Sequence, residues 1–362
     1  MKEHKVIDFA LIGEYELIIK DLLDALEGKK KLKNIPNILY RDNGKVRMTR
    51  RSKDPFLGIK FDSLPFPDRE DLPVEDYHDM EINGSPNAQM LTSRGCPFQC
   101  KFCCTTIMWP GGAYWQRSPE NVVDEMVYVR KKYKVKSVYF DDDVVFPNMI
   151  LGISKELKER GLDIPWTFMG SIHISEDVIK KAVDAGCIGL KFGIESINPE
   201  ALGGINKTWV KREKVKKFVE MCKKYNLFTH GTFIVGLPND SRKGILETLK
   251  FAMELDLDSF QVYAAVPLPG SPFYKEAKKN GWIVNHEWIY FNGDHPNISY
   301  PWLSKEEIEN LFNLWLRMRH LLILKRRLKN PHIMIKNILN TEPKFLMLKV
   351  MNFLFSKAEK PI

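Results

Sequence analysis

Cysteine is scarce in this chain, and an export signal and long apolar runs are missing. Six cysteines are spread over 362 residues, too few for the disulfide framework of a small secreted protein. The N-terminus is charged, and Asp8 and Glu14 interrupt its apolar run, so we predict neither a signal peptide nor a membrane anchor. No stretch of about 18 uncharged apolar residues occurs. We therefore expect a cytoplasmic protein with reduced cysteines.

Common catalytic patterns and an evenly spread charge are missing as well. Histidines occur singly, and there is neither a Ser-His-Asp pattern nor a glycine-rich phosphate loop. The formal net charge is +9, but from Arg317 to the C-terminus eleven Lys and Arg face only two Glu. The first 316 residues are therefore close to neutral, and the apolar share of 44% is that of a globular protein.

What the chain does have is a cysteine triplet, Cys96, Cys100 and Cys103, spaced C-x3-C-x2-C. Three thiolates on one loop can hold three irons of a four-iron cluster and leave the fourth iron open, whereas an electron-transfer cluster normally has every iron tied to protein. A structural zinc would need a fourth ligand, and Cys104 is too close to Cys103 to share one tetrahedral ion with it. We expect Cys104, Cys187 and Cys222 to be small buried residues.

Strand-like and helix-like segments alternate after this loop. Six repeats are predicted, with strands at 88–94, 136–141, 164–172, 187–195, 227–235 and 257–266. Helices are predicted from Ser118 and at 147–160, 175–185, 209–225, 241–254 and 271–279. Strands separated by helices pair in parallel through right-handed crossovers. An open doubly wound sheet or a partial barrel would satisfy this α/β pattern.

The two ends of the chain differ from this central part. Residues 1–87 predict one strand, one helix, a hairpin around Asp42-Asn43-Gly44 and a Pro-rich connector, which cannot enclose a core of their own. Residues 281–362 contain a basic amphipathic helix that begins with a capping box at Ser304 and Glu307. This region is either a helical cover for the barrel or a peripheral contact with an anionic membrane face. Nucleic acid is disfavoured because few aromatics lie among the arginines.

The cysteine loop, with an aromatic residue before its last cysteine, resembles that of the radical S-adenosylmethionine (SAM) enzymes. Later strand ends are similar to the family's Gly-Ile-Glu-Ser motif and to its Pro-Gly-Thr style of exit, here Pro269-Gly270-Ser271. The resemblance implies a partial (β/α)6 TIM-like barrel over residues 88–280. It also implies a [4Fe–4S] cluster on Cys96, Cys100 and Cys103, whose open iron binds SAM.

The resemblance also implies a set of SAM contacts. The positions concerned would touch adenine, ribose or the methionine amino group: Phe102, Asp141, Asp142, Gly193, Glu195, Ser196, Ile234 and Gly236. Each has a structural alternative. Phe102 can be ordinary packing, and the aspartates can cap the helix that starts near Pro147. The run Asp142-Asp143-Val144-Val145-Phe146 departs from the family's Asp-Asp-x-Phe pattern by one inserted residue.

The N-terminal stretch resembles the end of the cobalamin-binding domain of the cobalamin-associated radical SAM class. Gly13-Glu14 and the Leu64-Pro65-Phe66-Pro67 linker carry this likeness, but the Asp-x-His-x-x-Gly cobalamin motif does not occur. We therefore do not predict unaided cobalamin binding.

The implied activity is reductive cleavage of SAM with an electron from a ferredoxin or flavodoxin. The resulting 5′-deoxyadenosyl radical would modify an unreactive carbon of a lipid or other small molecule. Methyl or methylthio transfer is the alternative among enzymes. A non-catalytic iron–sulfur electron carrier or a degenerate interaction protein is the alternative outside them.

Overall fold

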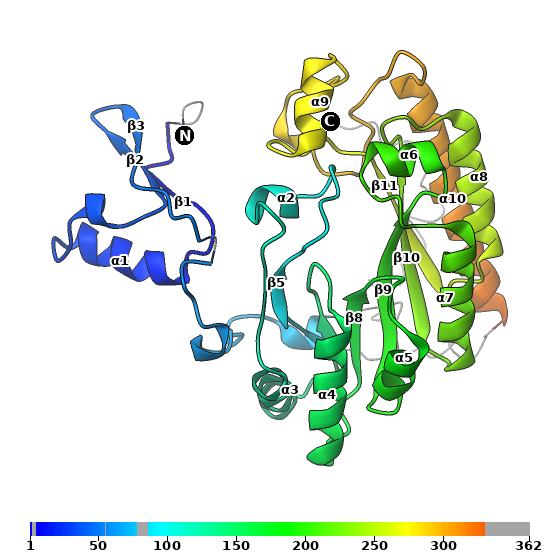
Figure 1. Ribbon diagram of the computed structural model, residues 1–362, viewed down its shortest axis with the longest axis horizontal. Helices are drawn as coiled ribbons and strands as arrows, with labels where there is room; N and C mark the ends of the chain where they lie inside the picture. Colours follow the sequence, from blue (N-terminus) through cyan, green and yellow to red (C-terminus); the bar gives the residue numbers. More distant parts are fainter. Residues whose placement is uncertain (2–4, 55, 78–85, 330–362) are drawn as a thin grey trace.

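The centre of the protein is a six-stranded parallel sheet. The computed structural model describes residues 1, 5–54, 56–77 and 86–329. Strands follow the order β11-β10-β9-β8-β7-β4, so each pairs with the next one along the chain, and all pairs in this sheet are parallel. The strands are β4 (Asn87–Met90), β7 (Ser137–Phe140), β8 (Trp166–Gly170), β9 (Cys187–Glu195), β10 (Phe228–Val235) and β11 (Ser259–Ala264). The sheet curves into a partial barrel with helices outside it (Figure 1), which confirms the predicted fold.

The outer helices begin where the sequence places serine caps. The Ser118, Ser241 and Ser271 side chains each accept a hydrogen bond from the third backbone N–H that follows them. The helices are α3 (Pro119–Tyr133), α4 (Pro147–Glu159), α5 (Glu176–Val183), α6 (Pro199–Gly204), α7 (Arg212–Lys224), α8 (Arg242–Glu254) and α9 (Pro272–Lys279). The helix expected from 209 starts instead at Arg212, and α6 was not predicted.

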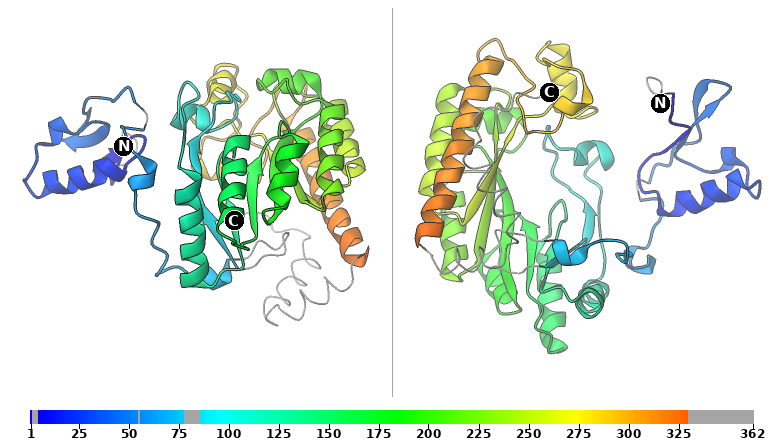
Figure 2. Two further views of the ribbon diagram at one scale, coloured as in Figure 1. Left: turned by 60° about the horizontal axis from the view of Figure 1, so that its bottom comes forward. Right: turned by 180° about the vertical axis from the view of Figure 1, so that it is seen from behind.

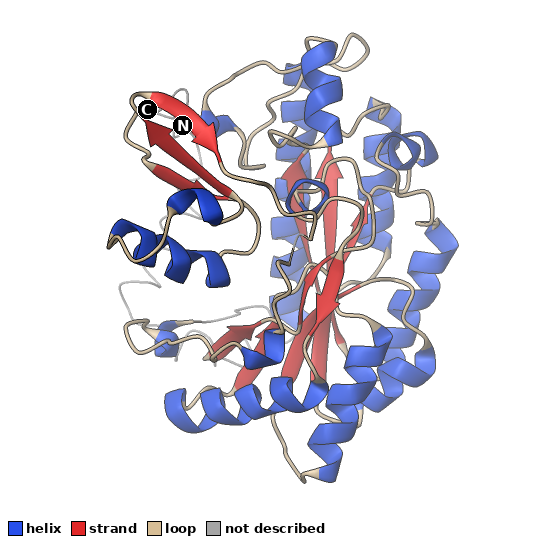
Figure 3. Cartoon of the chain, turned by 60° about the vertical axis from the view of Figure 1, so that its left-hand side comes forward, coloured by secondary structure: helices blue, strands red, loops and turns tan. Residues whose placement is uncertain are grey.

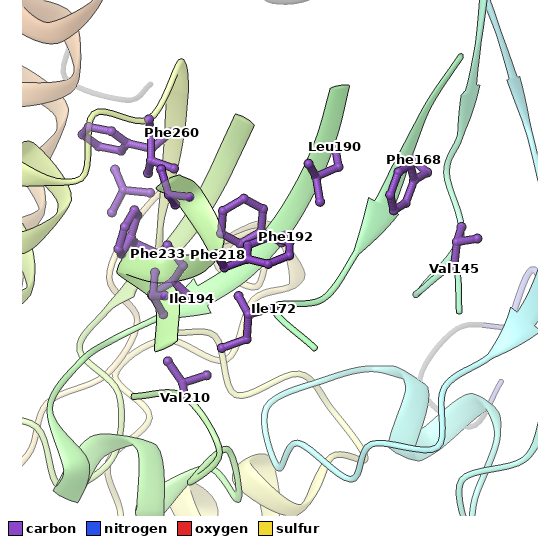
Figure 4. Close-up of a cluster of buried hydrophobic side chains, with 14 of the residues drawn as sticks. Val145, Phe168, Ile172, Leu190, Phe192, Ile194, Val210, Phe218, Phe233 and Phe260 are labelled. Atoms are coloured by element: carbon purple, nitrogen blue, oxygen red, sulfur yellow. The ribbon is translucent and has the colours of Figure 1, made fainter. Parts of the chain in front are cut away.

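The outer face of the sheet forms the main core. Its strands bury large side chains under the helices, and several of these are labelled in Figure 4: Phe168, Leu190, Phe192, Phe233 and Phe260. Burying each such side chain stabilises the fold by about 1.5–3 kcal/mol. Because side chains alternate along a strand, the residues between them face the inside of the barrel. That inner layer carries polar side chains such as Lys191, Thr232 and Gln261, none of which is fully buried.

The first predicted strand is divided in two. β4 ends at Met90, and β5 (Ser93–Gly95) leaves the parallel sheet to pair antiparallel with β6 (Tyr114–Gln116). Between β5 and β6 lies the cysteine loop, which contains the short helix α2 (Thr105–Met108). Gly95 has a φ of +88°, and a Cβ there would overlap the carbonyl oxygen of Ala113. Glycine at this position therefore lets the two ends of the loop come together.

β4 is an edge strand, and two arginines cover free carbonyls along it and directly after it. Arg69 Nη2 donates to Gln89 O at 2.9 Å, and Arg117 Nη1 donates to Leu91 O at 2.8 Å. The two oxygens of Glu125, whose side chain is 1% exposed, hold these same guanidiniums at 2.9 and 2.6 Å. The buried carboxylate thereby fixes the Pro-rich linker along an edge that could otherwise pair with another chain.

The N-terminal residues form a small unit beside the barrel (Figures 2 and 3). Strands β1 (Phe9–Leu11), β2 (Ile38–Asp42) and β3 (Lys45–Met48) make an antiparallel sheet against α1 (Glu16–Leu26). Ile18, Leu22, Ile35 and Ile38 make a small core of its own, so the expectation that this stretch cannot enclose a core was wrong, because three strands rather than one pack on α1. The predicted hairpin is confirmed, with positive φ at Asn43 and Gly44. Single-turn 3₁₀ helices occur at Leu32–Asn34, Phe61–Ser63, Val74–Asp76 and Trp288–Tyr290.

Helix α10 (Lys305–Lys329) covers the outer face of the last strands. Its capping box is confirmed, since Ser304 Oγ accepts from Glu307 N and Glu307 Oε2 accepts from Ser304 N. Trp315 packs against Phe233 and Phe260, with ring centroids 5.0 and 5.8 Å away. The described part of the basic region is therefore a helical cover, and the rest of the predicted membrane-contacting tail lies outside the described residues. None of the helices that the structure describes is long and apolar enough to cross a bilayer.

Candidate active site

The three predicted ligands lie together on the loop between β5 and β6. Cys96 and Cys100 are buried, and Cys103 is half-buried. Burial raises the pKa of Cys96 to about 11 and that of Cys100 to about 12. The negative charge of Cys103 adds to both shifts, and that of Cys96 adds to the shift of Cys100, so the three thiols lie within electrostatic range of one another. Hydrogen bonds, first from the Cys104 thiol and then from Thr105, lower the pKa of Cys103 to about 6.

This set of donors fits an iron–sulfur cluster better than a single ion. Within the described residues, no group of three or more His, Cys, Asp or Glu could hold one metal ion. The ligands of a four-iron cluster need not converge on one ion, because each thiolate binds its own iron at the rim of the cluster. Backbone bonds hold the loop, with Lys101 N donating to Ile205 O and Phe273 N donating to Lys101 O, each at 3.1 Å.

The remaining cysteines are mostly packing residues, as expected. Cys187 and Cys222 are buried in the outer core. Cys104 is exposed, so its prediction as a buried residue was wrong. It follows Cys103 and is the N-cap residue of α2.

An ion pair between Glu195 and Lys207 adjoins the cysteines. Lys207 Nζ lies 2.8 Å from Glu195 Oε1, and the two side chains are only 12% and 9% exposed. Lys207 Nζ also donates to Gly193 O at 3.0 Å, while Thr232 Oγ1 lies 3.3 Å from Glu195 Oε2. The Lys207 charge lowers the pKa of Cys100 against the effect of burial. The site therefore has a buried cation and a carboxylate next to the thiols.

Gly193 makes this pair possible. A Cβ at Gly193 would overlap Glu195 Oε1 and lie 2.8 Å from Lys207 Nζ. Glu195 itself has a φ of +63°, a strained value for a residue with a side chain. Sequence reasoning found Gly193 and Glu195 but missed Lys207, which reaches the site from the connection between α6 and α7.

The three consecutive aspartates after β7 have three different surroundings. Asp142 is buried and accepts hydrogen bonds from the backbone and hydroxyl groups of both Thr92 and Ser93. Burial raises its pKa to about 6 against the effect of these bonds. It thus holds the chain where β4 passes into β5. Its predicted SAM contact stays a prediction.

Asp143, which the sequence placed with Asp141 and Asp142 at this strand end, faces the cysteines. Its carboxylate accepts from Gly95 N, and its charge raises the pKa of Cys96. Asp141 is exposed and lines a neighbouring cavity, and its predicted SAM contact also stays a prediction. The expected capping by an aspartate was wrong, because Phe146 occupies the cap position of α4 without a side-chain bond.

The other predicted SAM contacts are placed as follows. Ser196 is buried, with its hydroxyl 3.2 Å from Thr248 Oγ1 and accepting from Asn198 N at 3.0 Å, so it holds the turn after β9. Gly236 has a φ of +84°, and a Cβ there would lie 2.9 Å from Ile308 Cγ2. Its lack of a side chain allows α10 to approach. Phe102 and Ile234 are half-buried beside the core, and their adenine contacts stay predictions.

The comparisons with known proteins agree with this geometry. The model of the radical SAM superfamily matches residues 90–252. An uncharacterized methyltransferase of Pyrococcus horikoshii is 32% identical over 342 residues, which cover 93% of this chain and 71% of that protein. The chain belongs to the radical SAM superfamily. The cytidylyl-2-hydroxyethylphosphonate methyltransferase of Streptomyces wedmorensis is 26% identical, over 85% of this chain and 62% of that protein.

Solved structures show the same fold. The radical SAM methyltransferase TsrM from Kitasatospora setae, with cobalamin and a [4Fe–4S] cluster bound, matches with a TM-score of 0.63 at 17% identity, over 84% of this chain and 60% of that one. The cobalamin-dependent enzyme OxsB matches with a TM-score of 0.55 at 16% identity, over 85% and 45%. The chain thus spans less than two thirds of several of its relatives. As a radical SAM protein it is an enzyme that uses a [4Fe–4S] cluster and SAM.

An aromatic group stands beside the radical SAM cysteines. Phe98, between Cys96 and Cys100, stacks on Trp209 with ring centroids 5.0 Å apart. The ring centroids of Phe146 and His173 lie 6.2 and 6.1 Å from that of Phe98. Burial lowers the pKa of His173, which favours its neutral form.

Proposed function

We propose that the protein transfers a methyl group from SAM to an unreactive carbon of a small molecule. The observation that carries this is the three-thiol loop beside a buried Glu195–Lys207 pair, in a chain whose relatives include named methyltransferases. Sequence reasoning favoured radical modification in general, with methyl transfer as its alternative. Because these relatives are named as methyltransferases, we favour methyl transfer.

The residues of the site have distinct parts in this proposal. When bound, the cluster and one SAM would supply reductive cleavage of the sulfonium, which yields methionine and, after removal of a hydrogen atom from the substrate carbon, 5′-deoxyadenosine. A second SAM would supply the methyl group and leave as S-adenosylhomocysteine, and the donor would deliver two electrons in all. Cys96, Cys100 and Cys103 hold the cluster and leave one iron free. Glu195 accepts hydrogen bonds from ribose hydroxyls, and Lys207 holds that carboxylate in place through their ion pair. Asp143 offers a negative charge to the ammonium group of SAM.

The reductant and the substrate follow from chemical class. The reaction needs a low-potential electron donor, for which a ferredoxin or flavodoxin is suitable. The substrate is a lipid or other small molecule. Cobalamin is not expected to bind this chain unaided. Titration of the protein with hydroxocobalamin, followed by gel filtration, tests this expectation, and a co-eluting corrinoid would contradict it.

The proposal is tested with methyl-deuterated SAM. The protein, reconstituted without oxygen, is incubated with dithionite, labelled SAM and an extract of small molecules. Methyl transfer predicts S-adenosylhomocysteine and a deuterated product by mass spectrometry. Formation of 5′-deoxyadenosine without S-adenosylhomocysteine and without a deuterated product would contradict methyl transfer and favour another radical modification. Absence of any SAM cleavage would contradict both and favour an iron–sulfur electron carrier.

Matched cysteine variants control the experiment. Cys100→Ala is expected to abolish the brown chromophore and all SAM cleavage. Cys222→Ala removes a buried thiol in the outer core and should retain both. Cleavage by Cys100→Ala would refute the ligand assignment itself.

A further inference from the structure

A cavity of about 500 Å³ lies along the edge of the barrel. The linker forms one wall with Phe61, Leu64, Phe66 and Leu72, and β4 and the residues after it form the other wall with Met90 and Leu91. Ser93 and Arg94, directly before the cysteine loop, and Asp141, at the end of β7, also line it. Its volume lies in the range of small-molecule sites, about 300–1,000 Å³.

Nearly every charge that lines the cavity is already paired. Arg69 and Arg117 are bound to Glu125, as described above. Arg94 Nη1 pairs with Glu14 and with Glu16 Oε1, the latter at 2.6 Å. Asp68 is exposed and has no ion pair with a described residue, but its Oδ1 accepts from the backbone N–H of Glu70 at 3.0 Å. These groups therefore hold the wall together and offer little to a ligand.

Asp141 differs from these groups. It is exposed, and no hydrogen bond or ion pair joins its carboxylate to another described residue. Only its backbone is engaged, with Asp141 N donating to Met90 O at 3.0 Å. A carboxylate without a hydrogen-bond or ion-pair partner among the described residues, set on apolar walls, selects a ligand with an apolar body and an ammonium group or another hydrogen-bond donor. It repels an anion.

The position of Asp141 links this cavity to the active site. It is two residues from Asp143, which faces the cysteines, and Asp142 between them is fixed by four donors from Thr92 and Ser93. A ligand whose donor group meets Asp141 would extend from the cluster side along the linker.

We infer that this cavity binds the substrate of the reaction, and that the substrate is an apolar small molecule with an amine or hydroxyl donor held by Asp141. This inference rests on the proposed function. It narrows the substrate class from any lipid or small molecule to uncharged or cationic apolar molecules.

The test measures binding rather than turnover, so that its result is independent of methyl transfer. The probes are 1-naphthylmethylamine and 1-naphthoic acid, which share a ring system and differ in charge. Equilibrium dialysis with the reconstituted protein is expected to show at least tenfold tighter binding of the amine, which corresponds to about 1.4 kcal/mol. Equal binding of the two probes, or no binding of the amine, would overturn the inference.

Two variants and one competitor complete the design. Asp141→Asn should remove the preference for the amine, whereas Asp163→Asn, at an exposed position after α4 and outside the cavity, should keep it. Because Asp141 is exposed, its variant is expected to fold. Addition of SAM should not displace the amine. Displacement would mean that Asp141 serves SAM, as the sequence first indicated, and would overturn the substrate assignment.

Discussion

The contact between Glu14 and Arg94 predicts that the N-terminal unit steadies the cysteine loop. Arg94 is two residues before Cys96, and Trp109 lies just after the loop's short helix. Glu14 binds both, since it pairs with the Arg94 guanidinium and accepts from Trp109 Nε1 at 3.3 Å. One buried carboxylate from residue 14 thus joins the two ends of a loop that lies about 80 residues further along the chain.

The free-energy cost of breaking the Glu14–Arg94 ion pair should lie between the cost for a buried pair and the cost for an exposed pair. The Glu14 side chain is 7% exposed and that of Arg94 is 23% exposed. Breaking a fully buried pair costs about 3–5 kcal/mol, whereas an exposed pair contributes about 0–1 kcal/mol. Because Arg94 keeps Glu16 as a second partner, we expect Glu14→Gln to cost about 1–2 kcal/mol in local opening of the loop.

Hydrogen exchange measures this cost directly. One or two kcal/mol corresponds to about five- to thirtyfold faster exchange of the amides in residues 96–109. Glu27→Gln, which removes an exposed carboxylate at the end of α1, is the matched control and should leave the loop unchanged. Iron content after reconstitution is the second readout and should fall only in Glu14→Gln. Equal exchange in the two variants would refute the reasoning.

Three further predictions concern the site and its support. Gly193→Ala should weaken SAM binding about tenfold or more, because the added Cβ displaces Glu195 from Lys207, and equilibrium dialysis measures this change. Gly203→Ala is the control, since a Cβ at Gly203 meets open space. Glu125→Gln should lower the free energy of thermal unfolding by about 3 kcal/mol, because Arg69 and Arg117 lose their shared carboxylate. Glu120→Gln, at an exposed position, is the control and should not lower it. An equal melting temperature of the two variants would contradict the role of Glu125 in covering the edge of β4. Burial raises the pKa of Asp240 to about 6, above its unfolded value, so the native state binds the proton more tightly and loses stability as pH rises through about 4 to 6. Asp240→Asn should lack this loss. The difference between the urea unfolding free energies of the unmodified protein and Asp240→Asn should therefore change by about 1.4 kcal/mol between about pH 5 and about pH 7.5. Parallel pH profiles of the two proteins would argue against this reasoning.

Local patterns predicted the elements well, because their causes lie within a few residues. The serine caps at Ser118, Ser241 and Ser271, the Asn43-Gly44 turn and the capping box at Ser304 each need only neighbouring backbone groups. The first strand was harder to predict. Its division at Leu91 depends on Asp142, about 50 residues away, which draws Thr92 and Ser93 out of the sheet.

By itself, the sequence determined the cysteine spacing, the order of strands and helices and the glycines at the strand ends. Only the tertiary structure decided which charges meet: Lys207 with Glu195, Glu14 with Arg94, and Asp143 rather than Asp142 with the cysteines. The physical reason is range. Hydrophobic period and capping act over a turn or two of chain, whereas an ion pair needs two side chains within about 4 Å, and only the folded barrel brings positions so far apart in sequence to that distance.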